Sequence, residues 1–205
     1  MLEAITYQEM LRNIKNNEIE NDTIGILITR PDLECGRNIL NSLNYYHHAS
    51  GNNINFYLPG YGAYWGENYP DKQIVTTIDG IKWAYSDQMF VKFVEDLEKY
   101  SKWKYSGESE LLMLEYQNGK LNFDAVMCFR LDNMLQDKVI NSVSSFFQRL
   151  FRIADNGRSL EQIRNTFGKQ QFIQMSKLII KDNIPEVWQD IVTQEKYFFV
   201  KNYRR

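Results

Sequence analysis

Cysteine, histidine and proline are scarce in this chain of 205 residues, with two, two and four of each. Cys35 and Cys128 lie far apart in the sequence, so they form neither a disulfide framework nor a short metal-binding motif. No apolar stretch approaches the roughly 18 to 20 residues that span a bilayer, and the first residues lack the pattern of a signal peptide. We therefore expect a soluble, cytoplasmic protein with no metal, no cofactor and no membrane contact.

Several catalytic motifs are also missing. Neither Gly-x-Ser-x-Gly nor His-x-x-x-His occurs, which disfavours a serine hydrolase of that type and a zincin. His47 and His48 are adjacent, so on a helix they point about 100° apart and cannot share a metal as an i, i+4 pair would. The glycines at 60, 62 and 66 have neither the Walker spacing nor the dinucleotide fingerprint, and the simplest interpretation is that they let a loop turn tightly.

The sequence is rich in aromatic side chains, with 13 Tyr and 12 Phe, and 43% of its residues are hydrophobic. A chain of this size and composition can bury a core without staples. Its net charge of −2 is unevenly distributed: Lys and Arg number 11 against 18 Asp and Glu in residues 1–129, and 13 against 8 in residues 130–205. Because the basic residues are scattered along the expected helices, solvated helix faces are favoured and nucleic acid is not expected as a partner.

The rest of the chain is organised around residues 23–62. An apolar run at 24–29 predicts a strand, residues 36–48 carry one apolar helical face, and residues 54–58 predict a second strand. This is the pattern of a βαβ unit with parallel strands. Ligands of such units gather beyond the carboxyl ends of the strands, which here lead into residues 30–36 and 59–66.

The remaining elements follow from caps and turn signals. Thr6 and Ser86 or Asp87 are N-caps for helices, while Asp79-Gly80 and Asn118-Gly119 are hairpin turns. These signals predict hairpins at 74–78 with 81–85 and at 110–116 with 121–130, then helices at 143–154, 159–181 and from 185 onward. The apolar tail at 197–200 is expected to dock as an edge strand or against a helix, unless it contacts a partner.

These elements predict a single α/β domain over residues 1–205, with a mixed sheet of about five to seven strands and helices packed against it. Residues 1–130 would be its sheet-rich part and residues 131–205 its helical part. The succession of elements is similar to that of nucleotide-sensing α/β modules of bacterial signalling and defence systems, a resemblance of fold alone.

The candidate ligand-binding residues lie on the two loops that follow the parallel strands. Arginines on the first loop suit an anion, its acids suit ribose hydroxyls, and the aromatics of the second loop suit a planar ring. The set is Arg30, Asp32, Glu34, Arg37, Tyr61, Tyr64 and Trp65. The competing interpretation is structural: Asp32 caps the helix, Arg37 pairs with a neighbouring carboxylate, and the aromatics pack the loop onto the body.

Two further features are weaker candidates for chemistry. Glu108 and Glu110 precede a strand at a spacing that places both on one face, where they could hold a divalent ion or act as acid and base, although acidic strand edges are common. Cys35 has no obvious partner base and is expected to be an unreactive thiol. No catalytic residue is assigned.

The function expected from these features is a ligand-sensing or protein-interaction module. Its ligand would be small and anionic or nucleotide-like, and it would act as an accessory subunit of a larger signalling or defence assembly, with a protein partner or a second copy. The alternative is a small nucleotide-processing enzyme, a hydrolase or glycosidase that uses the acids near the strand ends.

Overall fold

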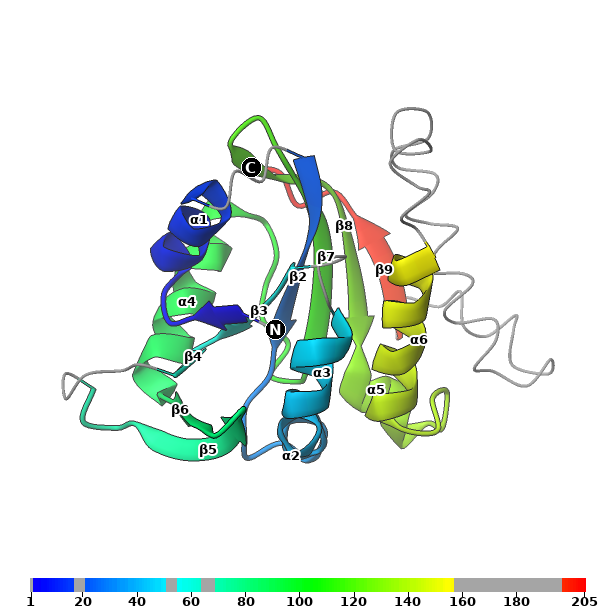
Figure 1. Cartoon of the computed structure of the whole chain (residues 1–205). Helices are drawn as coiled ribbons and strands as arrows, with labels where there is room; N and C mark the ends of the chain where they lie inside the picture. The colour runs from blue at the N-terminus through cyan, green and yellow to red at the C-terminus, as the bar shows by residue number, and fades with distance from the viewer. Residues whose placement is uncertain (1, 17–20, 51–54, 64–68, 157–196) are drawn as a thin grey trace.

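The computed structural model describes residues 2–16, 21–50, 55–63, 69–156 and 197–205. Its centre is a mixed six-stranded sheet (Figure 1). The strand order is β1 (Leu2–Ala4), β3 (Asn55–Pro59), β2 (Asn21–Ile28), β7 (Glu110–Gln117), β8 (Lys120–Arg130) and β9 (Phe198–Lys201). β3 is parallel to both β1 and β2, whereas β7, β8 and β9 each run antiparallel to the strand before them in that order. The predicted mixed sheet, with the 24–29 strand in its interior, is confirmed.

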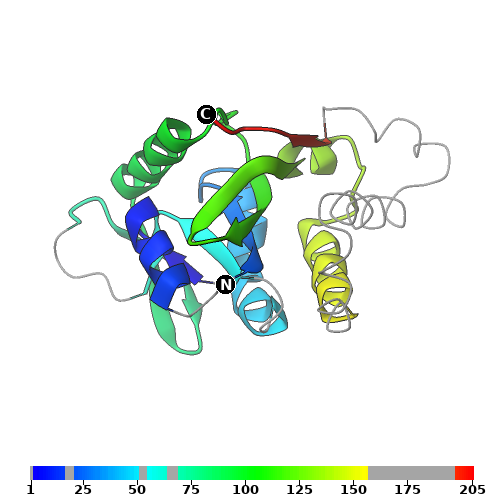
Figure 2. The ribbon, with the colours of Figure 1, turned by 90° about the horizontal axis from the view of Figure 1, so that it is seen from above.

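The two faces of the sheet carry different helices (Figure 2). On one face lie α1 (Tyr7–Asn16) and α4 (Asp87–Tyr100), which contact each other, and α4 also contacts β3. On the opposite face lie α2 (Glu34–Asn41), α3 (Leu43–Ser50), α5 (Leu131–Gln136) and α6 (Val143–Asn156). Since successive side chains of a strand point to opposite faces, each strand end offers residues to both helical layers.

The crossover between β2 and β3 consists of two helices where the sequence predicted one. The first helix ends at Ser42, the C-cap residue of α2, whose backbone N–H donates to the carbonyls of Ile39 and Leu40. The apolar positions still face inward as predicted, and Leu43 and Tyr46 of α3 are buried. The βαβ unit itself is confirmed, because β2 and β3 pair in parallel from Ile24 to Ile26.

A second, three-stranded antiparallel sheet lies beside the first, in the order β4 (Tyr61–Gly62), β6 (Ile81–Tyr85) and β5 (Gln73–Ile78). The sequence predicted the β5–β6 hairpin but not that it forms a sheet of its own. The hairpin is held against the crossover helices, because the hydroxyl of Thr76 donates to the carbonyl of Leu40 at 3.2 Å and the backbone N–H of Asp79 donates to Asn44 at 3.1 Å.

The helix caps predicted at Thr6 and Ser86 are both present in the structure. The hydroxyl of Thr6 accepts from the backbone N–H of Glu9 at 3.2 Å, and that of Ser86 accepts from Met89 at 3.2 Å. Asp71 adds to the second cap, since its carboxylate accepts from the Ser86 hydroxyl at 2.8 and 2.9 Å and from the backbone N–H of Gln88 at 3.0 Å. This ties the chain before β5 to the start of α4.

After Arg130 the described chain is helical in α5 and α6, and it then returns to the sheet as β9. The tail therefore docks as an edge strand, as the first of the predicted alternatives had it, and pairs Phe199 with Cys128. The helices predicted at 159–181 and from 185 lie outside the described residues. Every helix within the described residues is too short or too polar to span a membrane.

One continuous core joins both faces of the large sheet to the small sheet. On the α6 side, Phe56 lies across Gly25 of the neighbouring strand and contacts Phe147 and Phe151, with ring centroids 6.1 and 5.6 Å away. On the other side, Tyr7 of α1 contacts Phe93 of α4 at 5.7 Å. The predicted single α/β body is thus confirmed for the described residues.

Candidate functional site at the carboxyl end of β2

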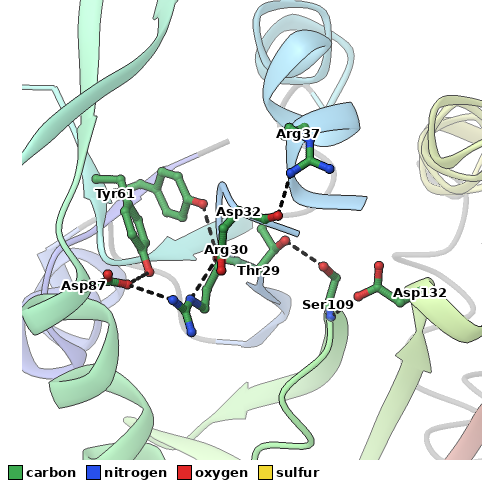
Figure 3. A network of polar contacts seen from close by, with 9 residues as sticks. Thr29, Arg30, Asp32, Arg37, Tyr61, Asp87, Ser109 and Asp132 are labelled. Carbon is green, nitrogen blue, oxygen red and sulfur yellow. Dashed lines mark hydrogen bonds and ion pairs between the residues drawn. The ribbon is translucent and has the colours of Figure 1, made fainter. Parts of the chain in front are cut away.

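Several elements meet where β2 ends. The parallel pairing of β2 with β3 brings the segment after β3 to this edge, and the antiparallel register, which pairs Ile28 with Glu110, brings the start of β7 there too. Thr29 and Arg30 follow β2 directly, and because strand side chains alternate, they serve opposite faces. Thr29 faces α5 and the start of β7, whereas Arg30 faces the start of α4 (Figure 3).

Arg30 is the centre of the charged group on the α4 face. Its Nη2 lies 3.5 Å from Oδ1 of Asp87, and its Nε lies 3.2 Å from Oδ1 of Asp32. Asp87 also accepts a hydrogen bond of 2.7 Å from the hydroxyl of Tyr85. Partial burial of Arg30 works against its charge, but the two carboxylates outweigh it and raise the pKa of the guanidinium. The side chains of Arg30, Asp32 and Asp87 are 38%, 62% and 56% exposed, respectively.

Two buried polar atoms in this group have no hydrogen-bond partner among the described residues. One is Nε of Arg30, since Asp32 is close enough for an ion pair but not in hydrogen-bond geometry. The other is the hydroxyl of Tyr105. Burial raises the pKa of Tyr105 to about 12, although the nearby charge of Arg30 lowers it. At neutral pH both atoms are therefore protonated donors that make no hydrogen bond among the described residues, although the Asp32 carboxylate lies 3.2 Å from Nε of Arg30.

Tyrosine side chains pack next to these charged groups. The hydroxyl of Tyr61 donates to the carbonyl of Thr29 at 3.2 Å, and its ring lies 4.7 Å from that of Tyr85. Burial raises the pKa of both phenols, so they stay protonated. Tyr61 was a candidate for stacking on a ligand, but it is completely buried, so the alternative prediction, that it packs its loop onto the body, holds for this residue.

On the opposite face a buried pair of hydroxyls lies beside one partly buried carboxylate. The hydroxyls of Thr29 and Ser109 lie 2.8 Å apart, and the backbone N–H of Ser109 donates to Oδ2 of Asp132 at 2.6 Å (Figure 3). The backbone N–H of Leu131 returns a hydrogen bond of 2.9 Å to the carbonyl of Ser109. Strand β2, strand β7 and helix α5 are thereby fixed to one another behind Arg30.

The turn from Arg30 to Arg37 depends on a glycine. A Cβ atom on Gly36 would lie 1.9 Å from the carbonyl oxygen of Arg30, so the start of α2 approaches the end of β2 more closely than any other residue allows. Arg37 lies on the same turn and its Nη1 donates to the carbonyl of Asp32 at 2.5 Å.

The structural roles predicted as the alternative for this turn are wrong in detail. Leu33 is the N-cap residue of α2 and no side chain makes a capping hydrogen bond there, so Asp32 is not a cap. Arg37 pairs with a backbone carbonyl and not with a carboxylate. Asp32 instead pairs with Arg30, and Glu34 is exposed on the first turn of the helix.

Thus Arg30, Asp32, Arg37 and Tyr61 lie together, as the sequence predicted for its two loops. Tyr64 and Trp65 lie outside the described residues. Sequence reasoning missed the residues that complete the group, namely Tyr85, Asp87, Tyr105, Ser109 and Asp132. Asp87 carried a usable signal, because it directly follows a predicted strand, but its position at the start of a helix indicated only a capping role.

The acids proposed for chemistry differ in their surroundings, since Asp32 is exposed and paired with Arg30 whereas Glu110 is buried. Glu110 is buried, and its Oε2 accepts from the indole Nε1 of Trp103 at 3.1 Å, while Arg130 Nε lies 3.8 Å from its Oε1. Burial raises the pKa of Glu110. Within the described residues, no group of three or more His, Cys, Asp or Glu side chains is placed to hold a metal ion.

Comparisons with protein families, with curated proteins and with solved structures find no match to this chain.

Proposed function

We propose that this protein is a binding module whose ligand occupies the carboxyl end of β2, at Arg30. The ligand is small and bears hydroxyl groups, as a nucleoside or nucleotide does. Asp32 and Asp87 accept hydrogen bonds from its sugar hydroxyls, and Arg30 and Tyr105 donate to its acceptor oxygens. The accessory role in a signalling or defence assembly stays a prediction, because no contact in the structure bears on it.

The observation that supports this proposal is that two buried donors of this group, Nε of Arg30 and the hydroxyl of Tyr105, make no hydrogen bond among the described residues, although Nε of Arg30 has the Asp32 carboxylate nearby. A buried polar group that lacks a hydrogen bond costs about 1 to 3 kcal/mol, so such groups favour a bound acceptor. The half-exposed carboxylates next to them are acceptors. A vicinal diol donates to carboxylates and accepts from a guanidinium, and therefore matches both sets of groups.

The local charge limits which part of a nucleotide lies here. Arg30 is already paired with two carboxylates, and Asp132 and Glu34 add negative charge to the same edge. A polyphosphate placed at Arg30 would have to displace Asp32 or Asp87. A phosphate would lie further out, near Arg37, whose guanidinium is exposed and uses one donor on the Asp32 carbonyl.

Binding is favoured over catalysis because general acid–base chemistry needs two groups within reach of one reacting atom. Asp32 is exposed and paired with Arg30, whereas Glu110 is buried against Trp103. The two acids therefore lie in different surroundings.

The proposal is tested with a thermal-shift screen of the intact chain against nucleosides, nucleotides, sugars and inorganic phosphate. A ligand at 100 times its dissociation constant adds about 2.7 kcal/mol of stability. For a chain of this size that corresponds to a rise in Tm of about 5 to 11 °C. We expect a ribose-bearing compound to produce such a rise and inorganic phosphate to produce none.

The matched variants are Asp87→Asn and Asp96→Asn, which make the same change at the first and third turns of α4. Asp87→Asn removes the carboxylate beside Arg30 and should weaken the ligand about tenfold, the effect of one charged hydrogen bond. Asp96→Asn should leave its affinity unchanged. Equal loss in both variants, or no stabilising compound at millimolar concentration, would contradict the proposal.

A further inference from the structure

The fold gathers basic side chains that are scattered in the sequence. Lys201 is the last residue of the edge strand β9, and the segment after it crosses from β8 to the end of α4. The backbone N–H of Tyr203 donates to the carbonyl of Phe123 at 2.8 Å, and the carbonyl of Tyr203 accepts from the backbone N–H of Lys102 at 2.7 Å. Residues about a hundred positions apart thus become neighbours.

The same crossing anchors both terminal arginines. Arg205 donates from Nε to the carbonyl of Ser101 at 3.0 Å and from Nη2 to the carbonyl of Glu98 at 2.8 Å, so it binds the last turn of α4. Arg204 lies 3.7 Å from Asp124 of β8. Lys104 reaches the side chain of Glu98 at 2.6 Å.

Aromatic rings lie between the cations along this edge. The guanidinium carbon of Arg130 lies 5.3 Å from the ring centroid of Phe199, and Nζ of Lys201 lies 4.9 Å from the same centroid. Tyr203 follows, with its ring 6.5 Å from that of Phe199. The ring of Phe199 thus holds two cations close together, of which Arg130 also lies 3.8 Å from Oε1 of Glu110.

The balance of charge here is positive, although the whole chain is slightly acidic. We define the tail surface as the six cations that these contacts connect. The nearest carboxylates are those of Glu98, Asp124 and the buried Glu110, with Glu108 beside the last. The tail surface consists of Lys102, Lys104, Arg130, Lys201, Arg204 and Arg205.

We propose that the tail surface binds the phosphate backbone of single-stranded nucleic acid. Sites of this kind carry a line of positive charge that follows the backbone. Phe199 is buried, so its ring positions Arg130 and Lys201 and is not a stacking platform for bases. An anionic membrane would call for large exposed apolar side chains among the cations, and Tyr100, beside Lys99, is the one large apolar side chain described as exposed near this surface. The expectation that nucleic acid is not a partner rested on the scatter of basic residues along the expected helices. Four of the basic residues in 130–205 lie together with Lys102 and Lys104 in the tail surface.

The test uses fluorescence anisotropy of a labelled 20-nucleotide oligothymidine with the intact chain. Phosphate contacts give a dissociation constant of about 1 to 100 µM at physiological salt and weaken as salt rises. We compare Lys102→Gln/Lys201→Gln with Lys72→Gln/Lys82→Gln, an equal loss of charge on exposed lysines at the small sheet. Circular dichroism confirms that each variant is folded.

The first double variant should weaken binding at least about tenfold and reduce the salt slope by about 1.4, because each phosphate contact on a single strand contributes about 0.7. The second should bind as the unmodified protein does. No binding at about 200 µM protein, or equal weakening in both variants, would overturn the proposal. Tighter binding to polyglutamate or to anionic phospholipid vesicles than to the oligonucleotide would overturn it as well and assign the surface to that partner.

Discussion

The hydrogen bond between the hydroxyls of Thr29 and Ser109 fixes the end of β2 to the start of β7, and its removal is a sharp test of how the Arg30 edge is held. Both residues are completely buried, and their oxygens lie 2.8 Å apart. Thr29→Val and Ser109→Ala each leave one buried hydroxyl without its partner. Each should therefore lower the free energy of unfolding by about 1 to 3 kcal/mol.

The double variant replaces both partners by apolar groups, so it leaves no orphaned hydroxyl. Its loss should be smaller than the sum of the two single losses by at least about 1 kcal/mol. Urea unfolding followed by tryptophan fluorescence measures these differences, since a loss of 2 kcal/mol lowers the midpoint by about 1 M at a typical slope. Strictly additive losses for Thr29 and Ser109 would refute the claim that this bond connects the two strands.

Three further predictions concern the surroundings of the site. Gly36→Ala should lower the free energy of unfolding by about 3 kcal/mol or more, because its Cβ would overlap backbone, whereas Gly80→Ala, with open space around it, should cost about 1 kcal/mol from its positive φ alone. Burial works against the charge of Asp71, but the hydrogen bonds that it accepts at the start of α4 outweigh this and lower its pKa. Its stabilising effect is therefore complete above about pH 4 and is lost as pH falls through the folded pKa. In a series of urea midpoints measured at falling pH, Asp71→Asn should reduce the loss of stability at acid pH. Burial raises the pKa of the Cys35 thiol to about 12, so it should react with a thiol reagent only after unfolding, and rapid labelling of the native protein would contradict this.

Much of the fold follows from local signals in the sequence. The caps at Thr6 and Ser86 and the hairpin turn at Asn118 are determined by side chains within a few residues, so the corresponding helices and strands were predicted. The break at Ser42 was not predicted, because the apolar period continues through it and only packing against the sheet separates the two helices.

The site was predictable only in part, for a related reason. Arg30 and Asp32 follow a strand in a βαβ unit, and the general behaviour of such units places them at a ligand edge. Asp87 and Tyr105 come from segments more than fifty residues later, and only the tertiary arrangement brings them to Arg30. The tail surface was hidden in the same way, since its charges are separated by about a hundred residues.

The most direct test of the central claim is an NMR titration that observes the Nε–H group of Arg30. This group is buried and lacks a hydrogen-bond acceptor among the described residues, so a bound acceptor oxygen must change its resonance. Its signal is assigned by its disappearance in Arg30→Lys, and a compound found in the thermal-shift screen is then added stepwise. We predict a saturable downfield shift of the Arg30 signal with the same dissociation constant that the thermal shift gives. Saturable shifts elsewhere in the spectrum, with the Arg30 Nε–H signal unmoved, would show that the ligand binds at another place and would contradict the account.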